Sequence, residues 1–234
     1  MNIRLVLQEG VDLGRKNVFA FVPVLVSSIL TWLISLITVG SSGTQMMHGT
    51  PGVMRTSVTG MAIGAILTAI ISMLAHGMTV LMAGRALDGQ PADLKQAFGK
   101  TTERIVPLLM ASVVVGVLLG IGFMLLVLPG LLIAFFLMFT FVALMVDELG
   151  AFESLGRSVQ VIKGRLVDCL VFFLVLIALG FVFGLVNLIL TRIPVVGVIL
   201  GMVVWALFAG YASMLLVIAY RELKWSAATD ETAV

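Results

Sequence analysis

Charge is scarce in this chain of 234 residues: Lys, Arg, Asp and Glu make up 11% of it, and 61% of the residues are apolar. Soluble domains average about 25% charged and about 45–50% apolar residues. A single globule of this length cannot hide so much apolar surface from water. The composition therefore excludes a soluble enzyme and a disordered chain, and it indicates a protein that lies in a lipid bilayer.

Cysteine, metal-ligand clusters and net charge are scarce as well. The single cysteine, Cys169, cannot form an intramolecular disulfide, which excludes a disulfide-stapled scaffold. The His, Cys, Asp and Glu residues show no metal-ligand spacing, so we expect neither a metal nor another cofactor. A net charge of +2 is too small to indicate a nucleic-acid partner.

Six long apolar runs dominate the chain instead. A helix needs about 20 apolar residues to cross about 30 Å of hydrocarbon. We therefore predict an all-α, polytopic membrane protein with spans at residues 18–39, 61–83, 105–128, 131–146, 166–190 and 195–220. The spans form one domain, residues 1–224, and the polar tail at residues 225–234 is expected to be disordered.

Short segments with proline and glycine predict where the chain reverses between spans. The third and fourth runs together would form a helix about twice as long as the membrane is thick, so they must fold back. Pro129 and Gly130 predict this reversal, because proline cannot continue a helix and glycine accepts the dihedral angles of a turn. Pro194 is expected to have the same effect between the fifth and sixth spans.

The basic residues are distributed unevenly between the two sides of this six-span arrangement. Twelve of the 14 Lys and Arg residues fall on the side of the N-terminus, and Arg55 and Arg192 fall on the other. Short loops that are rich in basic residues stay in the cytoplasm. The distribution therefore predicts that both termini are cytoplasmic.

A similar segment precedes each odd-numbered span, at residues 7–16, 93–101 and 151–158. Apolar residues recur in each at helical spacing, which predicts three amphipathic helices in the membrane interface. The chain would then be a threefold repeat of one interfacial helix and one hairpin, although any span that enters from the cytoplasm favours such a lead-in. The expected apolar faces consist of Ile3, Leu7 and Val11, of Leu94, Ala97 and Phe98, and of Phe152, Leu155, Val159 and Ile162.

Pairs of glycines four residues apart lie on four of the spans. Such pairs allow helix backbones to approach each other closely. We expect them to pack the spans within one bundle, and a contact between two copies of the chain is the alternative. The pairs are Gly60 and Gly64, Gly116 and Gly120, Gly180 and Gly184, and Gly197 and Gly201.

Three polar side chains inside the apolar runs are candidates for function, because polar groups are costly in a membrane. We expect His76 and Asn187 to form hydrogen bonds between helices. We expect Asp168 to pair with Arg165, three residues before it on the same helix face. The alternative for His76 is a role in handling protons or binding a ligand.

The sequence contains no catalytic signature: no G-x-S-x-G, no H-E-x-x-H, no Walker loop and no paired carboxylates at membrane depth. We therefore expect no catalytic residue and no enzymatic activity. The densest group of charges is expected to be the solvated face of an interfacial helix near anionic lipid head groups. This group consists of Glu148, Glu153, Arg157 and Lys163.

One stretch of the chain resembles a known group of proteins. Pro129-Gly130 opens an apolar helix, an acidic segment follows it, and a basic-Ser pair and a Lys-Gly pair lead into the next span. The pattern is similar to that of uncharacterised bacterial inner-membrane families, namely the YciC-like proteins and the membrane domain that precedes the catalytic domain of some glycerophosphodiester phosphodiesterases. The resemblance implies six spans and a bacterial inner membrane, and it does not imply phosphodiesterase activity, since that catalytic domain is separate. The matching positions are Glu148, Glu153, Arg157, Ser158, Lys163 and Gly164.

These features leave three hypotheses for function. The first is a non-catalytic membrane scaffold or lipid-interacting module, whose partners are membrane lipids and either another protein or a second copy of the chain. The second is a small-solute permease or channel that uses His76 and Asn187. The third is a membrane-embedded lipid enzyme in which the charged group just described handles lipid head groups.

Overall fold

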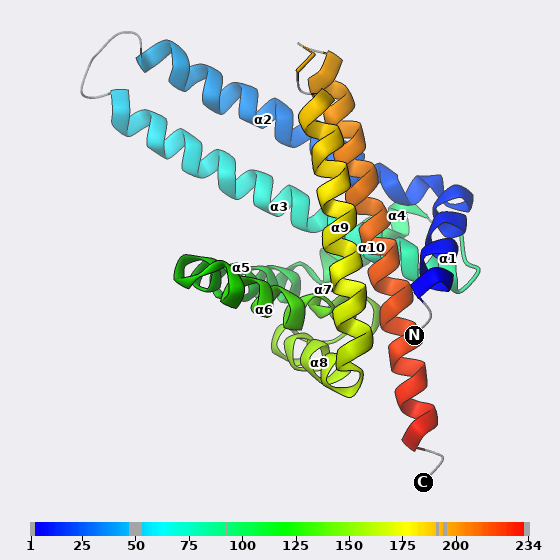
Figure 1. Ribbon diagram of the computed structural model, residues 1–234. Helices are drawn as coiled ribbons and strands as arrows, with labels where there is room; N and C mark the ends of the chain where they lie inside the picture. Colours follow the sequence, from blue (N-terminus) through cyan, green and yellow to red (C-terminus); the bar gives the residue numbers. More distant parts are fainter. Residues whose placement is uncertain (1–2, 47–52, 92, 191, 194–195, 232–234) are drawn as a thin grey trace.

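The computed structural model describes residues 3–46, 53–91, 93–190, 192–193 and 196–231, and these residues form helices and short connections without a β-strand (Figure 1). The amphipathic segments form α1 (Ile3–Lys16), α4 (Leu94–Glu103) and α8 (Ala151–Gly164). The apolar segments form η1 (Val18–Phe21), α2 (Val22–Met46), α3 (Val53–Leu87), α5 (Ile105–Leu125), α6 (Val127–Leu137), α7 (Thr140–Val146), α9 (Leu166–Leu190) and α10 (Val196–Glu231). The predicted all-α class is confirmed.

Within the described residues, six helical segments are long and apolar enough to cross a membrane, which confirms the predicted number of spans. The protein is therefore a multi-pass membrane protein. The second and sixth segments extend further than predicted, because the Ala, Leu, Arg and Lys residues that follow them are good helix formers. The six segments are Val18–Ile37, Ala62–Leu87, Ile105–Leu125, Val127–Val146, Leu166–Leu190 and Ile199–Trp225.

The spans are arranged as three hairpins, and an amphipathic helix precedes each of them. α1 precedes the hairpin of α2 and α3, α4 precedes that of α5 with α6 and α7, and α8 precedes that of α9 and α10. The hairpins meet at one end and diverge toward their tips (Figure 1). This order of elements is the predicted threefold repeat of helix and hairpin.

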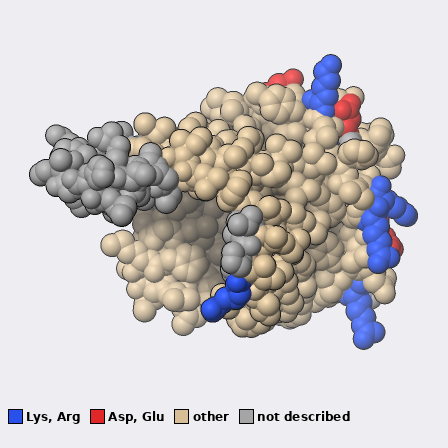
Figure 2. All heavy atoms as spheres, turned by 90° about the horizontal axis from the view of Figure 1, so that it is seen from above, with Lys and Arg blue, Asp and Glu red and all other residues tan. Residues whose placement is uncertain are grey.

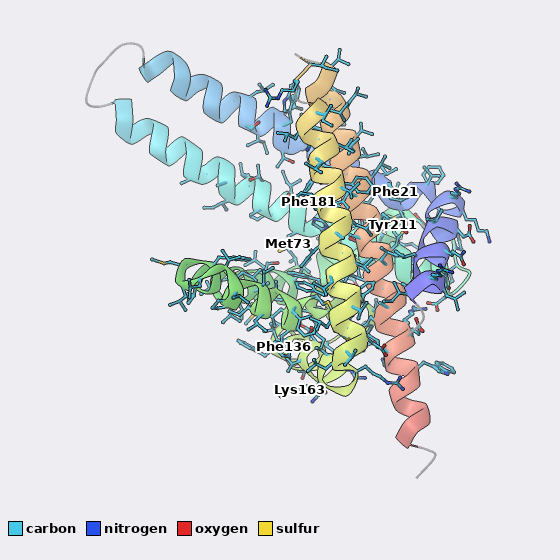
Figure 3. All side chains as sticks on the ribbon, in the orientation of Figure 1. Phe21, Met73, Phe136, Lys163, Phe181 and Tyr211 are labelled. Carbon is cyan, nitrogen blue, oxygen red and sulfur yellow. The ribbon has the colours of Figure 1, made fainter. Side chains whose placement is uncertain are left out.

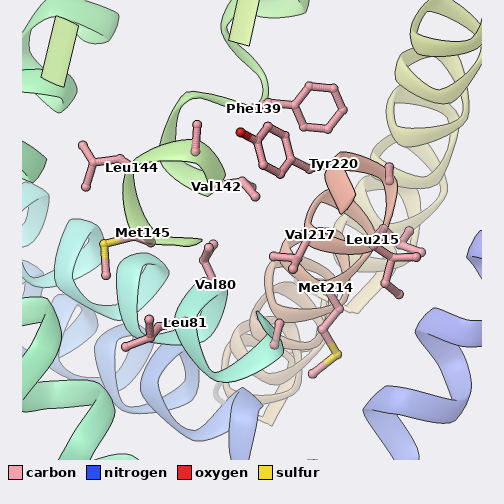
Figure 4. Packing of buried hydrophobic residues seen from close by; sticks show 14 of the residues in the cluster. Val80, Leu81, Phe139, Val142, Leu144, Met145, Met214, Leu215, Val217 and Tyr220 are labelled. Atoms are coloured by element: carbon pink, nitrogen blue, oxygen red, sulfur yellow. The ribbon is translucent and has the colours of Figure 1, made fainter. Parts of the chain in front are cut away.

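The hydrophobic core lies where the three hairpins meet (Figure 4). Val80 of α3, Val142 of α7 and Val217 of α10 contribute to it, with exposed fractions of 4%, 1% and 0%. Large apolar side chains farther along the hairpins are exposed, for example Met124 (91%) and Ile189 (69%). The core holds the hairpins together at one end, and lipid tails are the solvent that suits the remaining apolar surface.

The reversal between α5 and α6 comes earlier in the chain than predicted. α5 ends at Leu125, Leu126 is extended with φ −168° and ψ 160°, and α6 begins at Val127. Pro129 lies in the first turn of α6, where its missing N–H removes no helical hydrogen bond. Gly130 has no positive φ, so it does not supply the turn. The prediction was wrong here because proline fits the first turn of a helix as well as a position after its end.

Glycines bring α5 and α6 close together just beyond this turn. A Cβ placed on Gly130 would lie 2.5 Å from Cδ1 of Phe123. A Cβ placed on Gly122 would lie 2.9 Å from Cα of Gly130, which is backbone and cannot move aside cheaply. Gly122 and Gly130 therefore form a close contact between two spans that the predicted glycine pairs did not include.

The predicted glycine pairs lie in different surroundings. Gly64 is buried, and a Cβ on Gly180 would lie 3.3 Å from Cζ of Phe208. A Cβ on Gly197 would meet the carbonyl group of Leu190 at the start of the last hairpin turn. Four positions differ from the packing prediction, because the hairpins diverge there and a Cβ would find nothing within 4 Å among the described residues: Gly60, Gly116, Gly120 and Gly184.

The amphipathic helices bury small residues as well as Val6, Leu13 and Ile162, and they expose several other large side chains. The predicted apolar faces are correct only in part, because Val11, Phe98 and Phe152 are 41%, 55% and 66% exposed. Close approach explains the difference on α1, where a Cβ on Gly10 would lie 2.6 Å from Cδ2 of Leu215. The small buried residues are Gly10 and Gly14 on α1, Ala97 and Thr101 on α4, and Ala151, Ser154 and Ser158 on α8.

The N-terminal unit is fastened to α10 next to this contact (Figure 3). The hydroxyl of Tyr211 donates a hydrogen bond of 3.1 Å to the carbonyl oxygen of Leu7. Phe21 of η1 covers Gly210, where a larger residue would clash with the ring. α10 is thus the helix against which the N-terminal helix is held.

The C-terminal segment is more regular than expected. α10 continues to Glu231, so the tail predicted to be disordered is helical up to that residue. Ala227 and Ala228 lie in this part, and alanine has the highest helix propensity. Residues 232–234 of the tail and Pro194, a predicted turn residue, lie outside the described residues.

Gly122→Ala is expected to destabilise the protein by about 1–3 kcal/mol, because the new Cβ forces α5 and α6 apart. Gly120→Ala, two residues earlier on the same helix, is the matched control, since its Cβ meets open space. The control is expected to leave the melting temperature unchanged or slightly raised, because alanine favours helix more than glycine does. Thermal unfolding in detergent measures both, and equal melting temperatures would contradict the close contact at Gly122.

Candidate functional site

Charged side chains gather at the end of the molecule where the core lies. They come from α4, α10 and the segments that follow α3, α4 and α7, and ion pairs or hydrogen bonds join them. Asp147 and Glu148, which directly follow α7, lie at the centre of the set. We name the set the charged layer, and it consists of Asp88, Lys100, Arg104, Asp147, Glu148, Tyr220, Arg221 and Lys224.

Asp147 joins the fourth span to the sixth. Its side chain is only 13% exposed. Its Oδ2 accepts a hydrogen bond of 2.6 Å from the hydroxyl of Tyr220, and its Oδ1 accepts one of 2.8 Å from Nζ of Lys224. Tyr220 is fully buried, and Arg157 of α8 lies beside its hydroxyl. Both oxygens of a largely buried carboxylate are therefore bonded to one helix, α10.

Glu148 faces the second hairpin instead. Its φ of 55° lies in the left-handed region, which residues other than glycine seldom adopt. Its carboxylate lies 3.7 Å from Nζ of Lys100 and 3.4 Å from Nη2 of Arg104. The same guanidinium donates to the carbonyl oxygens of Leu144 and Leu149, at 3.4 and 3.3 Å. Arg104 thereby fastens the start of α5 to the end of α7.

Asp88 and Arg221 join the second span to the sixth. Nη1 and Nη2 of Arg221 donate to Oδ1 and Oδ2 of Asp88 over 2.5 and 2.9 Å. The hydrogen bond from this guanidinium lowers the pKa of the Asp88 carboxyl below its ordinary value. Asp88 is half exposed, so the pair alone contributes little to stability. Its importance is that α10 now contacts both the first and the second hairpin through charged groups.

Two cavities open beside the charged layer. The larger one, of about 430 Å³, is lined by Lys100, Arg104 and Glu148 among other residues, and the smaller one, of about 170 Å³, by Asp88 and Arg221. The carboxylates of Glu148 and Asp88, one in each cavity, have cationic partners. These ion pairs therefore suit a structural joint between the hairpins.

Ser158, one of the residues of the family-like stretch, closes a break in the fourth span. The break lies between α6 and α7, where helical hydrogen bonds are interrupted. The buried Oγ of Ser158 donates to the carbonyl oxygen of Phe136 over 2.8 Å and accepts from the N–H of Phe139 over 3.2 Å. One hydroxyl thus satisfies a backbone acceptor and a backbone donor on either side of the break and fixes α8 to the span.

The other residues of that stretch do not converge on one site. Glu153 caps α8, since its Oε2 accepts a hydrogen bond of 3.0 Å from the N–H of Gly150. Arg157 lines a separate cavity of about 270 Å³ together with Arg165 and Lys224. Lys163 is exposed near the end of α8 (Figure 3). The four charged residues of the motif are therefore dispersed: Glu148 forms ion pairs, Glu153 caps a helix, Arg157 lines a separate cavity and Lys163 is exposed.

The three intramembrane polar candidates lie far apart in the chain and in different environments. Nη1 of Arg165 lies 3.9 Å from Oδ2 of Asp168, the ion pair expected from their spacing. His76 is exposed on the surface of α3. Asn187 lines a groove between the first and third hairpins, and its Oδ1 would lie 2.5 Å from a Cβ on Gly201. The structure thus gives His76 and Asn187 no common site.

Sequence reasoning missed the partners of Asp147. Tyr220 and Lys224 are four residues apart on one helix, a spacing that places both side chains on the same face. This signal was available, but nothing in the local sequence connects that face with an acid more than 70 residues earlier. The described residues contain no group of three His, Cys, Asp or Glu side chains placed to hold a metal ion.

Comparison of the chain with protein-family models, with curated proteins and with solved structures found no match. The likeness of residues 129–165 to bacterial membrane families therefore stays an expectation that rests on the motif alone.

Tyr220→Phe is expected to destabilise the protein by about 1.5–3 kcal/mol, the usual contribution of a hydrogen bond to a charged group. Tyr211→Phe is the matched control, since Tyr211 lies on the same helix as Tyr220 and its hydroxyl donates to the neutral carbonyl group of Leu7 on α1. Its expected cost is about 0.5–1.5 kcal/mol. Denaturant or thermal unfolding in detergent compares them, and a Tyr220→Phe cost no larger than the control would contradict the anchoring role of Asp147.

Proposed function

We propose that this protein is a non-catalytic module of a bacterial cytoplasmic membrane that interacts with lipid and scaffolds a partner or a second copy of the chain. In the proposed orientation both termini and the charged layer lie on the cytoplasmic side. The distribution of basic residues supports this orientation, because Lys and Arg are retained in cytoplasmic loops. The six spans then hold three amphipathic helices in the cytoplasmic interface.

The observation that carries the proposal is the outward face of those three helices. Leu5 of α1, Phe98 of α4 and Phe152 of α8 are 58%, 55% and 66% exposed. Exposed basic residues accompany them, as at Arg4 and Lys95. Large apolar side chains next to cations are typical of helices that lie in a membrane interface with anionic lipids.

A lipid enzyme is supported less well than a non-catalytic module. Its expected residues would have to converge on one head group, whereas Glu148 and Arg157 line different cavities and Glu153 caps a helix. The carboxylate of Glu148 is also engaged by Lys100 and Arg104. These contacts stabilise the junction of the hairpins and support a structural role for the motif.

A small-solute permease is the second candidate, and one observation favours it. Asn187 lines an open groove between the hairpins together with hydroxyl groups of α2 and α3. His76, the other residue expected in such a path, is not among the residues that line it.

Fluorescence quenching tests the lipid-interacting face directly. The native Trp32, Trp205 and Trp225 are replaced by Phe, and a single Trp is introduced by Phe98→Trp. In vesicles, lipids that carry bromine on their acyl chains quench a Trp in contact with them. We expect brominated phosphatidylglycerol to quench this Trp more strongly than brominated phosphatidylcholine, because Lys95 and Lys100 flank it.

Gln90→Trp in the same background is the control. Gln90 is exposed in the connection before α4, where no amphipathic face is formed, and its Trp is expected to remain unquenched. Lys95→Gln is expected to reduce the preference for phosphatidylglycerol at Phe98→Trp. Quenching at position 98 no stronger than at position 90 would show that α4 faces water, and the proposed interaction with lipid would be wrong.

A further inference from the structure

A groove separates the first hairpin from the third at the end opposite to the charged layer. Its volume is about 660 Å³, within the range of about 300–1,000 Å³ typical of ligand pockets. Trp32 of α2, Thr68 of α3, Asn187 of α9 and Trp205 of α10 contribute to its walls. Figure 2 looks down on this end of the molecule and shows a hollow in the surface. The groove therefore opens between two hairpins that share a core only at their other end.

The outer end of the groove lies near the boundary between acyl chains and head groups, and its inner end reaches Ser28, near the middle of the span Val18–Ile37. Asn187 lies three residues before the end of α9 at Leu190, or about 5 Å along the helix axis. Trp32 and Trp205 lie on the facing helices, and tryptophan is enriched at this level of a membrane. A molecule in the groove would thus have its polar part near Asn187 and its apolar part between the spans.

The hydroxyl groups that line the groove can accept hydrogen bonds from a ligand. Ser28, Ser35 and Thr68 each donate their hydroxyl proton to a carbonyl oxygen of their own helix, over 2.8, 2.7 and 2.9 Å. A hydroxyl whose proton is used in this way still has oxygen lone pairs that accept hydrogen bonds. These three positions therefore favour a ligand whose polar part carries N–H or O–H donors.

Asn187 adds donors to this set of acceptors. Its side-chain amide offers two N–H donors and one carbonyl acceptor. Gly201 on α10 provides the space for it, because a Cβ there would lie 2.5 Å from Oδ1 of Asn187. The N–H groups fit an ester carbonyl or a phosphate oxygen, which are acceptors. Figure 2 also shows Lys or Arg atoms at the edge of the hollow, a charge that suits a phosphate.

Apolar and aromatic surface completes the groove. Trp205 is 50% exposed and packs against Phe208 with ring centroids 5.5 Å apart, and Phe208 in turn contacts Phe183 at 5.2 Å. This row of rings begins at the groove and continues into the contact between α9 and α10. An acyl chain is the kind of ligand that gains by contact with such a surface in a membrane.

We propose that this groove binds one phospholipid of the outer leaflet, with a head group that carries hydrogen-bond donors, such as ethanolamine. The ammonium donates to the hydroxyl oxygen of Thr68, and the amide of Asn187 donates to an ester or phosphate oxygen. One acyl chain lies along Trp205 and the rings beyond it. The inference rests on the proposed membrane orientation and adds a lipid site on the side opposite to the amphipathic helices.

Native mass spectrometry of the full chain, released from nanodiscs, tests the site. Phosphatidylethanolamine and phosphatidylcholine with identical acyl chains are the probes, because the trimethylammonium group of the second has no N–H donor. We expect the wild-type chain to retain phosphatidylethanolamine about fivefold more than phosphatidylcholine, the factor that one hydrogen bond supplies. Thr68→Val is expected to remove this preference. Asn187→Leu is expected to weaken the retention of both lipids equally, because both carry the ester and phosphate oxygens to which its amide would donate.

Ser112→Ala is the matched control, because Ser112 also donates to its own helix, over 2.8 Å, but lies on α5 outside the groove. It is expected to keep the wild-type preference. Thr68→Val preserves side-chain volume, so it gives a result even if Asn187→Leu fails to fold. Equal retention of the two lipids by the wild-type chain, or retention of a small solute in place of a lipid, would overturn the proposal. The quenching preference at position 98 would then still stand, so the failure of the groove is distinguishable from failure of the proposed function.

Discussion

The carboxylate of Asp147, held between the hydroxyl of Tyr220 and the ammonium of Lys224, is the contact on which the arrangement of the hairpins depends. It joins the end of the fourth span to the sixth, over 2.6 and 2.8 Å, at a point where the side chain is 13% exposed. A carboxylate this far from water is destabilising unless both oxygens are bonded, so the protein cannot separate these helices without cost. Arg221 on the same helix adds the bond to Asp88, which brings in the first hairpin.

Because the contacts between hairpins are concentrated at one end, the hairpins diverge toward their other ends. The core residues and the charged layer occupy the shared end, whereas the far parts of the hairpins expose side chains such as Met124. Lipid tails solvate those surfaces as well as other spans would, so no packing force draws the tips together. Gly116 and Gly120 lie in the open part, while Gly122 and Gly130 bring α5 to α6 next to the turn. A groove between the first and third hairpins follows from the same divergence.

Local features of the sequence were sufficient to predict the spans. They were not sufficient to predict the contacts that join the hairpins. Span number follows from apolar length, which is a property of each segment alone, and the order of amphipathic helices and hairpins follows from charge and periodicity. The turn near Pro129 was misplaced because proline is compatible both with the first turn of a helix and with a position after the end of a helix. The pairing of Asp147 with Tyr220, and the closure of the α6–α7 break by Ser158, join segments that only the folded chain brings together. Asn187 was identified from its polarity, but the hydroxyl groups around it come from two other helices.

A double-mutant cycle between Asp147→Asn and Lys224→Gln tests the central claim most directly. The free energy of unfolding is measured in one detergent for the wild-type chain, the two single variants and the double variant. If Asp147 and Lys224 hold the fourth and sixth spans together, the double variant is less destabilised than the sum of the single variants by about 1 kcal/mol or more. Strictly additive effects would contradict the account, because they would show that the two side chains do not interact in the folded protein.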